Sequence, residues 1–291
     1  ANGALAERVL VTANAGNGTG LTISRAFGGS TIAAIPNNSW LLRVGTAFAE
    51  GSGAASSYST NPVKMNNLAQ IFKTSYEVTN TAKLTTFRTG DPLKNEKKRK
   101  MFTHAVDMEL AYLFGSKAEV IGTNGQPLRS TAGIVSQLST NVKAYDSSPN
   151  KFQINTHVAD LVKLFDYDAG GAGTERFIFC GNGYLLELQK AIEAKSNVRI
   201  NFEGSIKVYG MELTKMVLPQ GTFYIKTHPL FNVHPVHAYS ALVFNPKGLI
   251  DRYLRKTNFE DNIQAPGSDY VKGQWLTESG PEVHFEGSHG F

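Results

Sequence analysis

The spacing of apolar residues predicts one long helix at residues 91–115. Asp91 followed by Pro92 is typical of a helix start, Gly115 is a plausible stop, and no other Gly or Pro lies between them. At about 100° per residue, the second half of this helix presents one broad apolar face. That face is formed by Met101, Phe102, Ala105, Val106, Met108, Tyr112 and Leu113.

The first two turns of the predicted helix are basic on every side. Positive charge near a helix N-terminus opposes the helix dipole at a cost of about 0.3–1 kcal/mol per well-placed charge, and Asp91 and Glu96 offset only part of it. We therefore expect this end either to be solvated or to contact an acidic surface of another subunit or nucleic acid. The cations concerned are Lys94, Lys97, Lys98, Arg99 and Lys100.

Two further polar groups lie on this helix. Glu109 falls near the middle of the apolar face, where an unpaired buried carboxylate would be costly. Either the helix edge is open and Glu109 reaches water, or Glu109 forms a fixed salt bridge with an Arg or Lys of the packed strands or of a neighbouring subunit. His104 and Asp107 are expected to form a surface pair on the polar side.

Residues 1–90 are patterned differently from the rest of the chain. They hold short β-type runs separated by stretches rich in Asn, Gly, Ser and Thr. Each run carries few apolar side chains, so this region cannot bury enough surface to fold well alone and needs another surface to lie on. The predicted strands are residues 8–13, 21–26, 40–44, 69–74 and 77–86.

The remainder of the chain contains segments with helical spacing and segments with strand-like spacing, which predicts an α+β fold. Helical spacing occurs at residues 155–165 and 184–194, whereas residues 129–140 are ambiguous. A Pro-Gln-Gly turn at residues 219–221 predicts a hairpin. The predicted strands are residues 176–180, 206–218, 222–227, 241–244, 270–277 and 282–285.

Composition narrows the class of protein. The 291 residues are 41% hydrophobic, which is ample for a core and suggests one or two domains. Charged residues make up only 18%, below the usual quarter, so the surface is unusually neutral. A net charge of +5 is too weak to indicate a dedicated nucleic-acid binder.

The single cysteine, Cys180, excludes intramolecular disulfides and fits a reducing compartment. No apolar run is long enough to span a membrane and no signal-peptide pattern occurs, which predicts a soluble chain.

Candidate catalytic motifs are weak. Gly181-Asn182-Gly183 after a short apolar strand resembles a dinucleotide-binding turn, but Leu186 stands where the third glycine belongs. A tight strand-to-helix turn explains these glycines equally well. Cys180 ends an apolar strand, where a free cysteine usually behaves as a small hydrophobe.

Three histidines, His228, His234 and His237, lie within ten residues and could in principle bind zinc. Their spacing fits no ligand pattern of a helix or hairpin, so partly buried histidines bonded to backbone carbonyls are expected instead. We predict no catalytic residue, metal site or cofactor.

The order of these parts resembles the major capsid proteins of tailed bacteriophages, which share the Hong Kong 97-type fold. The resemblance runs from about residue 40 to the end and depends on the order of its motifs. Residues 1–39 depart from the pattern. The motifs are RVGTAFAEG at 43–51, NLAQIF at 67–72, YEVTNT at 76–81, MELAYLFG at 108–115, YLR at 253–255 and a strand at 280–285.

The resemblance implies a division of the chain. An N-terminal arm would precede an extension loop that reaches over a neighbouring subunit. A peripheral domain would contain the long helix as its spine, and an axial domain would meet its copies at the centres of hexamers and pentamers. In order, these would be the arm 1–19, the extension loop 20–76, the peripheral domain 77–117, the axial domain 118–237, peripheral strands 238–282 and a C-terminal segment 283–291.

The resemblance also implies a function. The chain would be a structural subunit without enzymatic activity that self-assembles into hexamers and pentamers of an icosahedral head around double-stranded DNA. Its partners would be its own copies, portal, scaffolding and cement proteins, and DNA through weak non-specific contacts. It would reside in the virion after assembly in the host bacterial cytoplasm, with no membrane contact.

Subunit contacts would take the place of an active site. Charge contacts are assigned to the five cations named above and to Glu109. Apolar anchors where the loop crosses a neighbour are assigned to Trp40, Phe48, Ile71 and Phe72. The alternatives are another phage component, such as a tail-tube or decoration protein, and a nucleotide-binding α/β enzyme that uses Gly181 and Gly183.

Overall fold

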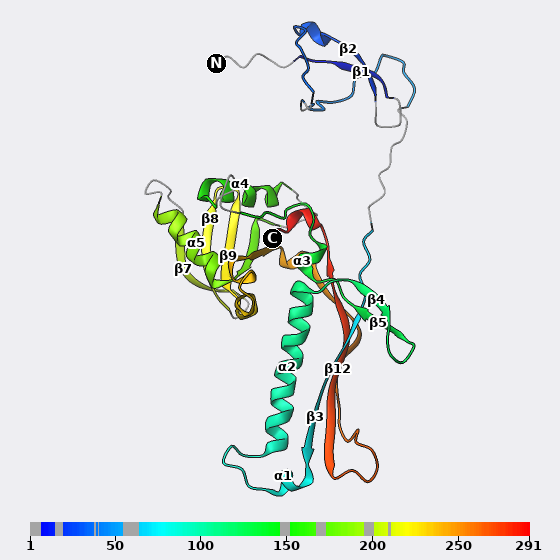
Figure 1. The fold of residues 1–291 in the computed structure, drawn as a ribbon. Coiled ribbons are helices and arrows are strands. Elements are labelled where there is room, and N and C mark those ends of the chain that lie inside the picture. Colours follow the sequence, from blue (N-terminus) through cyan, green and yellow to red (C-terminus); the bar gives the residue numbers. More distant parts are fainter. Residues whose placement is uncertain are drawn as a thin grey trace. The chain divides into compact units, whose positions relative to one another are not determined.

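The chain forms two compact units, Ala1–Pro62 and Val63–Phe291 (Figure 1). Each is described by itself. The computed structural model describes residues 7–14, 20–37, 39, 41–54, 64–145, 152–166, 173–194, 201–208 and 211–291.

The first unit is built around a small antiparallel hairpin. Strand β1 (Leu10–Asn14) pairs with β2 (Leu21–Ser24), close to two of the predicted strands. The carboxylate of Glu7 accepts hydrogen bonds from the Arg25 guanidinium and from the backbone N–H of Ala33. The prediction of a strand at residues 40–44 is wrong in its described part, because residues 41–44 have no strand partner. Trp40 lies outside the described residues.

The second unit contains a three-stranded antiparallel sheet with the order β11-β12-β3. Two strands predicted at 69–86 prove to be one strand followed by a short helix, α1 (Asn80–Leu84), which Thr79 caps through Ala82 N. The strands predicted at 270–277 and 282–285 also prove to be one continuous strand that ends at Val283, because β11 pairs with the residues between them, including Pro281. The strands are β3 (Gln70–Thr79), β11 (Leu249–Glu260) and β12 (Tyr270–Val283).

The predicted long helix is confirmed as α2 (Pro92–Phe114), which lies beside β3 and β12 (Figure 1). The Asp91 carboxylate accepts from Leu93 N at 2.9 Å, and Gly115 N donates to Ala111 O at 2.9 Å. The predicted apolar face is wrong in its first half. Met101 is 55% exposed and Phe102 72%, whereas His104 is buried.

A five-stranded mixed sheet, with the order β10-β6-β9-β8-β7, forms the other half of the second unit. Strands β6 and β9 are parallel and the other neighbours are antiparallel. The single strand predicted at 206–218 is in fact parts of two paired strands, β7 and β8. The strands are β6 (Glu175–Cys180), β7 (Asn201–Val208), β8 (Met211–Leu218), β9 (Gly221–Thr227) and β10 (Ala241–Phe244).

The remaining elements follow the sequence pattern closely. Helical spacing correctly predicted α4 (Ile154–Val162), which continues into a 3-10 turn, and α5 (Asn182–Glu193). The ambiguous residues 129–140 contain the end of one strand and a short helix. These are β5 (Pro127–Ser130), paired with β4 (Ala118–Ile121), and α3 (Ile134–Gln137).

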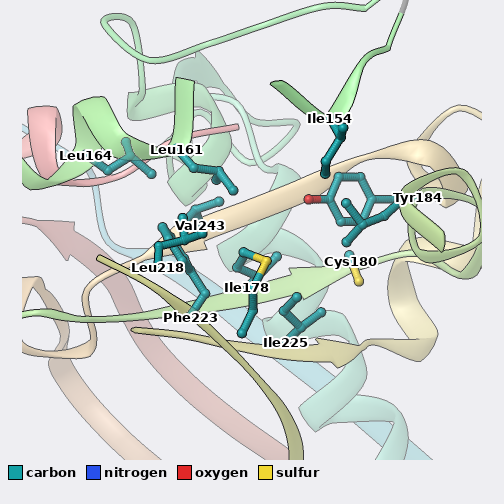
Figure 2. Packing of buried hydrophobic residues seen from close by; sticks show 12 residues of the cluster. Ile154, Leu161, Leu164, Ile178, Cys180, Tyr184, Leu218, Phe223, Ile225 and Val243 are labelled. Atoms are coloured by element: carbon teal, nitrogen blue, oxygen red, sulfur yellow. The ribbon is translucent and has the colours of Figure 1, made fainter. Parts of the chain in front are cut away.

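Apolar side chains of β6, β8, β9 and β10 are buried on both faces of the five-stranded sheet. On one face α4 and α5 cover Ile178, Cys180, Phe223 and Ile225, as Figure 2 shows. Alternate residues of the strands point to the opposite face. There Phe177, Leu213 and Leu242 pack with Leu113 at the end of α2 and with Ile134 and Leu138. The C-terminal end of α2 is therefore anchored in the sheet's core.

Candidate subunit-contact surfaces

Lys97 is engaged inside its own chain rather than projecting to a partner. Its Nζ lies 2.8 Å from Asp261 Oδ2 and 4.5 Å from the centre of the Phe259 ring. Tyr76 donates to the other oxygen of Asp261 at 2.9 Å. The hydrogen bond to Asp261 raises the pKa of Lys97. The proposal that Lys97 makes an inter-subunit contact is therefore weakened by its internal pair.

The other cations of the basic end remain accessible. Lys94 is 4.0 Å from Asp91, and Arg99 pairs with Glu96 at 3.0 Å, both with side chains more than 70% exposed. Such exposed pairs contribute little and leave the charges open to another surface. Lys98 and Lys100 have no ion pair within the part of the chain that the structure describes.

Glu109 pairs with a histidine, not with the Arg or Lys that was expected. Its Oε1 lies 3.0 Å from Nε2 of His228, while half of the Glu109 side chain stays exposed. His228 Nδ1 accepts from Leu230 N at 3.3 Å, so the ring proton sits on Nε2 and is donated to Glu109. The pair links α2 to the connection after β9.

The predicted surface pair of His104 and Asp107 is wrong. His104 is 2% exposed, with Nδ1 3.0 Å from Thr74 Oγ1 and Nε2 2.8 Å from Thr277 Oγ1. Burial lowers the pKa of His104, which stays neutral between the two hydroxyls. Because the strands offer hydroxyls at this position, a polar residue of α2 faces them and Met101 and Phe102 turn outward. Sequence reasoning missed this because nothing local pairs residue 104 with residues 74 and 277.

The four residues expected to be loop anchors differ in exposure. Trp40 is outside the described residues, Phe48 is 63% exposed in the first unit and Ile71 is 48% exposed on β3. Phe72 is 6% exposed and meets the rings of His104 and Tyr112 edge-on at 6.5 and 6.2 Å. Phe72 is therefore a core residue of its own chain, and its assignment as an anchor on a neighbour is corrected.

The first unit exposes many apolar side chains. Leu42 and Val44 are each 88% exposed on a stretch without a strand partner, and no apolar side chain described in this unit is buried. The exposed large apolar residues of this unit are Val11, Leu21, Phe27, Ile32, Ile35, Leu41, Leu42, Val44 and Phe48. Single exposed apolar residues are ordinary, so it is their number in one small unit in which no described apolar residue is buried that points to an interaction surface.

Comparison with known proteins identifies the family. The sequence model of the SU10 major capsid protein family matches residues 11–291. The chain belongs to this family. It is 30% identical over 271 residues to the major capsid protein of Pseudomonas phage PaMx41, an alignment that covers 91% of this chain. The alignment covers only 62% of that relative, so the chain spans about 62% of its length.

Solved structures agree with the family at the level of the fold. The capsid of an empty GTA particle, computed with C5 symmetry, matches with a TM-score of 0.54 at 11% identity. It covers 84% of this chain and 79% of the other. The capsid of the native GTA particle matches with a TM-score of 0.53 at 10% identity, over 84% and 80%. Identities this low show the fold alone, which is the Hong Kong 97-type α+β capsid fold. Family and fold together place this SU10-family chain among the structural capsid proteins of phages.

The packing around the glycine turn argues against the phosphate site that the enzyme alternative requires. A Cβ at Gly181 would lie 2.3 Å from Ala238 O, and one at Gly183 would lie 2.8 Å from the Tyr239 ring. Residues 238–239 therefore cover the start of α5, where Asn232 Oδ1 already accepts from Asn182 N at 2.8 Å. Close packing is the reason for both glycines.

The other chemical candidates are structural as well. No group of three or more metal-ligating side chains occurs among the described residues. His228 and His234 accept hydrogen bonds from backbone N–H groups, so the expectation that these histidines bond to carbonyls is wrong for both. Burial raises the pKa of Cys180 to about 12, which makes it an inert small hydrophobe. Within the described residues, no helix is long and apolar enough to cross a membrane.

A buried histidine also lines a cavity of about 440 Å³ beside α4 and α5. His157 lies 2.7 Å from the Tyr184 hydroxyl and 3.3 Å from that of Tyr145, which donates to Asp160. Burial lowers the pKa of His157 to about 4. Both ring nitrogens are paired with neighbouring side chains, so this network is a wall of the cavity rather than an acid–base site.

Proposed function

We propose that copies of this chain assemble into hexamers and pentamers that close into an icosahedral head around double-stranded DNA. The observation that carries this proposal is the first unit, which exposes apolar side chains and buries none of those described. In this proposal the head forms in the host bacterial cytoplasm, and the chain's role in the virion is structural.

The energetics of the first unit favour burial against another subunit. Burying a Val or Leu side chain fully contributes about 1.5–3 kcal/mol. Leu42 and Val44 lie two residues apart and are each 88% exposed, so both side chains are available to another surface. A surface provided by a neighbouring copy would supply what the unit's own fold does not.

Roles for the parts of the chain follow from this arrangement. The first unit would act as the extension loop, reaching over a neighbour, whereas β3 would belong to the peripheral sheet although the resemblance placed most of it in the loop. The sheet with α2 would form the peripheral domain, and the five-stranded sheet most of the axial domain. Strand β10 pairs with β6, so it would belong to the axial domain although the resemblance placed it with the peripheral strands. Portal, scaffolding and cement proteins would be further partners, and the modest charge of +5 suits weak, non-specific DNA contact.

A double variant tests whether the exposed apolar stretch mediates assembly. We expect L42D/V44D to abolish particles seen by negative-stain electron microscopy and fast-sedimenting species seen by sedimentation velocity. The subunit should stay folded, because both side chains are 88% exposed. R43D is the matched control, since it lies between them and also changes the net charge by two. Equal particle yield from L42D/V44D, or equal loss from R43D, would contradict an apolar contact at this stretch.

A further inference from the structure

Phe285 combines an unfavourable backbone conformation with an exposed ring. It lies just after β12 with φ 54° and ψ 61°, in the left-handed region. This region is sterically unfavourable for a residue other than glycine, and a bulky residue seldom adopts it. The ring is 59% exposed, so burial within its own chain does not offset that cost.

Contacts on both sides hold the backbone at Phe285 in place. His284 N donates to Gly248 O at 2.8 Å, which fixes the residue before it. The carboxylate of Glu286 accepts from the Thr140 N–H and hydroxyl, each at 2.6 Å, which fixes the residue after it. Ser288 donates to Phe285 O through both its N–H and its hydroxyl at 2.8 Å. The ring is therefore displayed on a rigid support.

The turn itself does not need a phenylalanine. Glycine adopts the left-handed conformation without the steric cost, and asparagine tolerates it better than a bulky residue does. The ring's closest aromatic neighbour among the described residues is His284, at 6.2 Å between centroids. The hydrogen bonds of the subunit hold this backbone without using the side chain at position 285, so a contact of the ring outside the subunit would explain why a phenylalanine stands there.

The surroundings of Phe285 are those of an interface anchor. Glu282, three residues before Phe285, accepts hydrogen bonds from the Arg252 guanidinium and from His284 Nε2, so charged groups of both signs lie at the end of β12 that leads into Phe285. A rigid aromatic residue within a polar rim is typical of residues that dominate binding energy. A rim of mixed charge can also face a copy of the same protein without net repulsion.

We propose that Phe285 is an aromatic anchor that docks onto a second copy of this chain. The inference rests on the proposed function, because only a self-assembling chain offers that partner. It assigns one specific side chain of the segment after β12 to a contact between subunits.

The first experiment uses the opposite effects that F285G should have on folding and assembly. We expect F285G to unfold at an equal or higher denaturant concentration than the natural chain, because the strain is removed. The protein concentration at which half of the chains are assembled, measured by sedimentation velocity, should rise about tenfold or more, because an interface anchor is lost. N262G is the matched control, because Asn262 has φ 55° on an exposed connection and should assemble normally. A less stable F285G, or one that assembles like the natural chain, overturns the anchor.

A second variant reports directly on burial of position 285. Cys180 is the only cysteine and is fully buried, so F285C carries a single reactive thiol. Maleimide should label F285C quickly in dissociated subunits and at least tenfold more slowly in assembled particles. Equal labelling rates in particles overturn the anchor while leaving the proposed function intact. A natural chain that never assembles overturns the proposed function, and the anchor with it.

Discussion

Glu109 of the long helix and His228 of the connection after β9 form a hydrogen-bonded pair 3.0 Å apart. The pair ties α2, which packs on the three-stranded sheet, to the connection that follows β9, the central strand of the five-stranded sheet. The two halves of the second unit are thus linked by a polar contact as well as by the apolar cluster around Leu113.

Reversing the charge of Glu109 should harm assembly more than folding. In E109K a cation faces His228, so the connection after β9 shifts, but half of the side chain is already in water. We expect particle yield by electron microscopy to fall several-fold while the soluble subunit yield changes little. E109Q is the control, because its amide oxygen still accepts from His228 Nε2. Equal particle yield from E109K would count against a role for this pair.

Lys97 and Lys98 are neighbours with opposite expected behaviour. K97A removes the ion pair with Asp261 and the contact with the Phe259 ring, so it should lower the free energy of unfolding by about 1 kcal/mol. K98A should change it by less than about 0.5 kcal/mol, because Lys98 is exposed. Urea denaturation measures the free energy of unfolding of both variants.

Lys98 can also be tested for a contact between subunits. If Lys98 contacts an acidic neighbour, K98A should weaken assembly more at low salt than at high salt.

Gly181 should tolerate no side chain. G181A places a Cβ 2.3 Å from Ala238 O, where the obstacle is backbone and cannot rotate away. Overpacking of this kind costs about 1–3 kcal/mol, which thermal or urea denaturation would detect. G53A is the control, because its Cβ would meet nothing within 4 Å.

The close packing around Gly181 also predicts that NAD and ATP leave the melting temperature unchanged. A ligand-induced rise would revive the enzyme alternative.

Acid should destabilise the subunit through its buried histidines. The pKa of His157 is about 4 when folded, below its ordinary value of about 6.5, so the unfolded chain binds the proton first. The contribution of His157 to the free energy of unfolding is therefore fully present above about pH 6.5. As the pH drops towards 4, protonation of this histidine in the unfolded chain lowers the free energy of unfolding by roughly 3 kcal/mol. The lowered pKa values of His104, His237 and His289 act in the same direction. Urea midpoints at pH 7 and 4.5 measure the loss, which should shrink in H157Q. An unchanged pH dependence in H157Q would contradict this assignment.

Local signals in the sequence predicted most elements but not how α2 packs. Asp91, Pro92 and Gly115 marked the ends of the helix, because capping depends on adjacent residues. Which face of that helix is buried depends on strands far away in the chain, and Thr74 and Thr277 select His104 over Met101. Phe72 was misassigned for the same reason, since its partner Tyr112 lies forty residues further on. The family resemblance supplied the fold, while the contacts between subunits remain predictions.

Self-assembly is tested most directly by sedimentation velocity of the purified chain, alone and co-expressed with a scaffolding protein. Negative-stain electron microscopy of the same samples would show the species formed. We expect closed shells, or hexamers and pentamers, in at least one of these conditions. A chain that stays a monomer or dimer at every salt and protein concentration, with and without scaffolding, would contradict it.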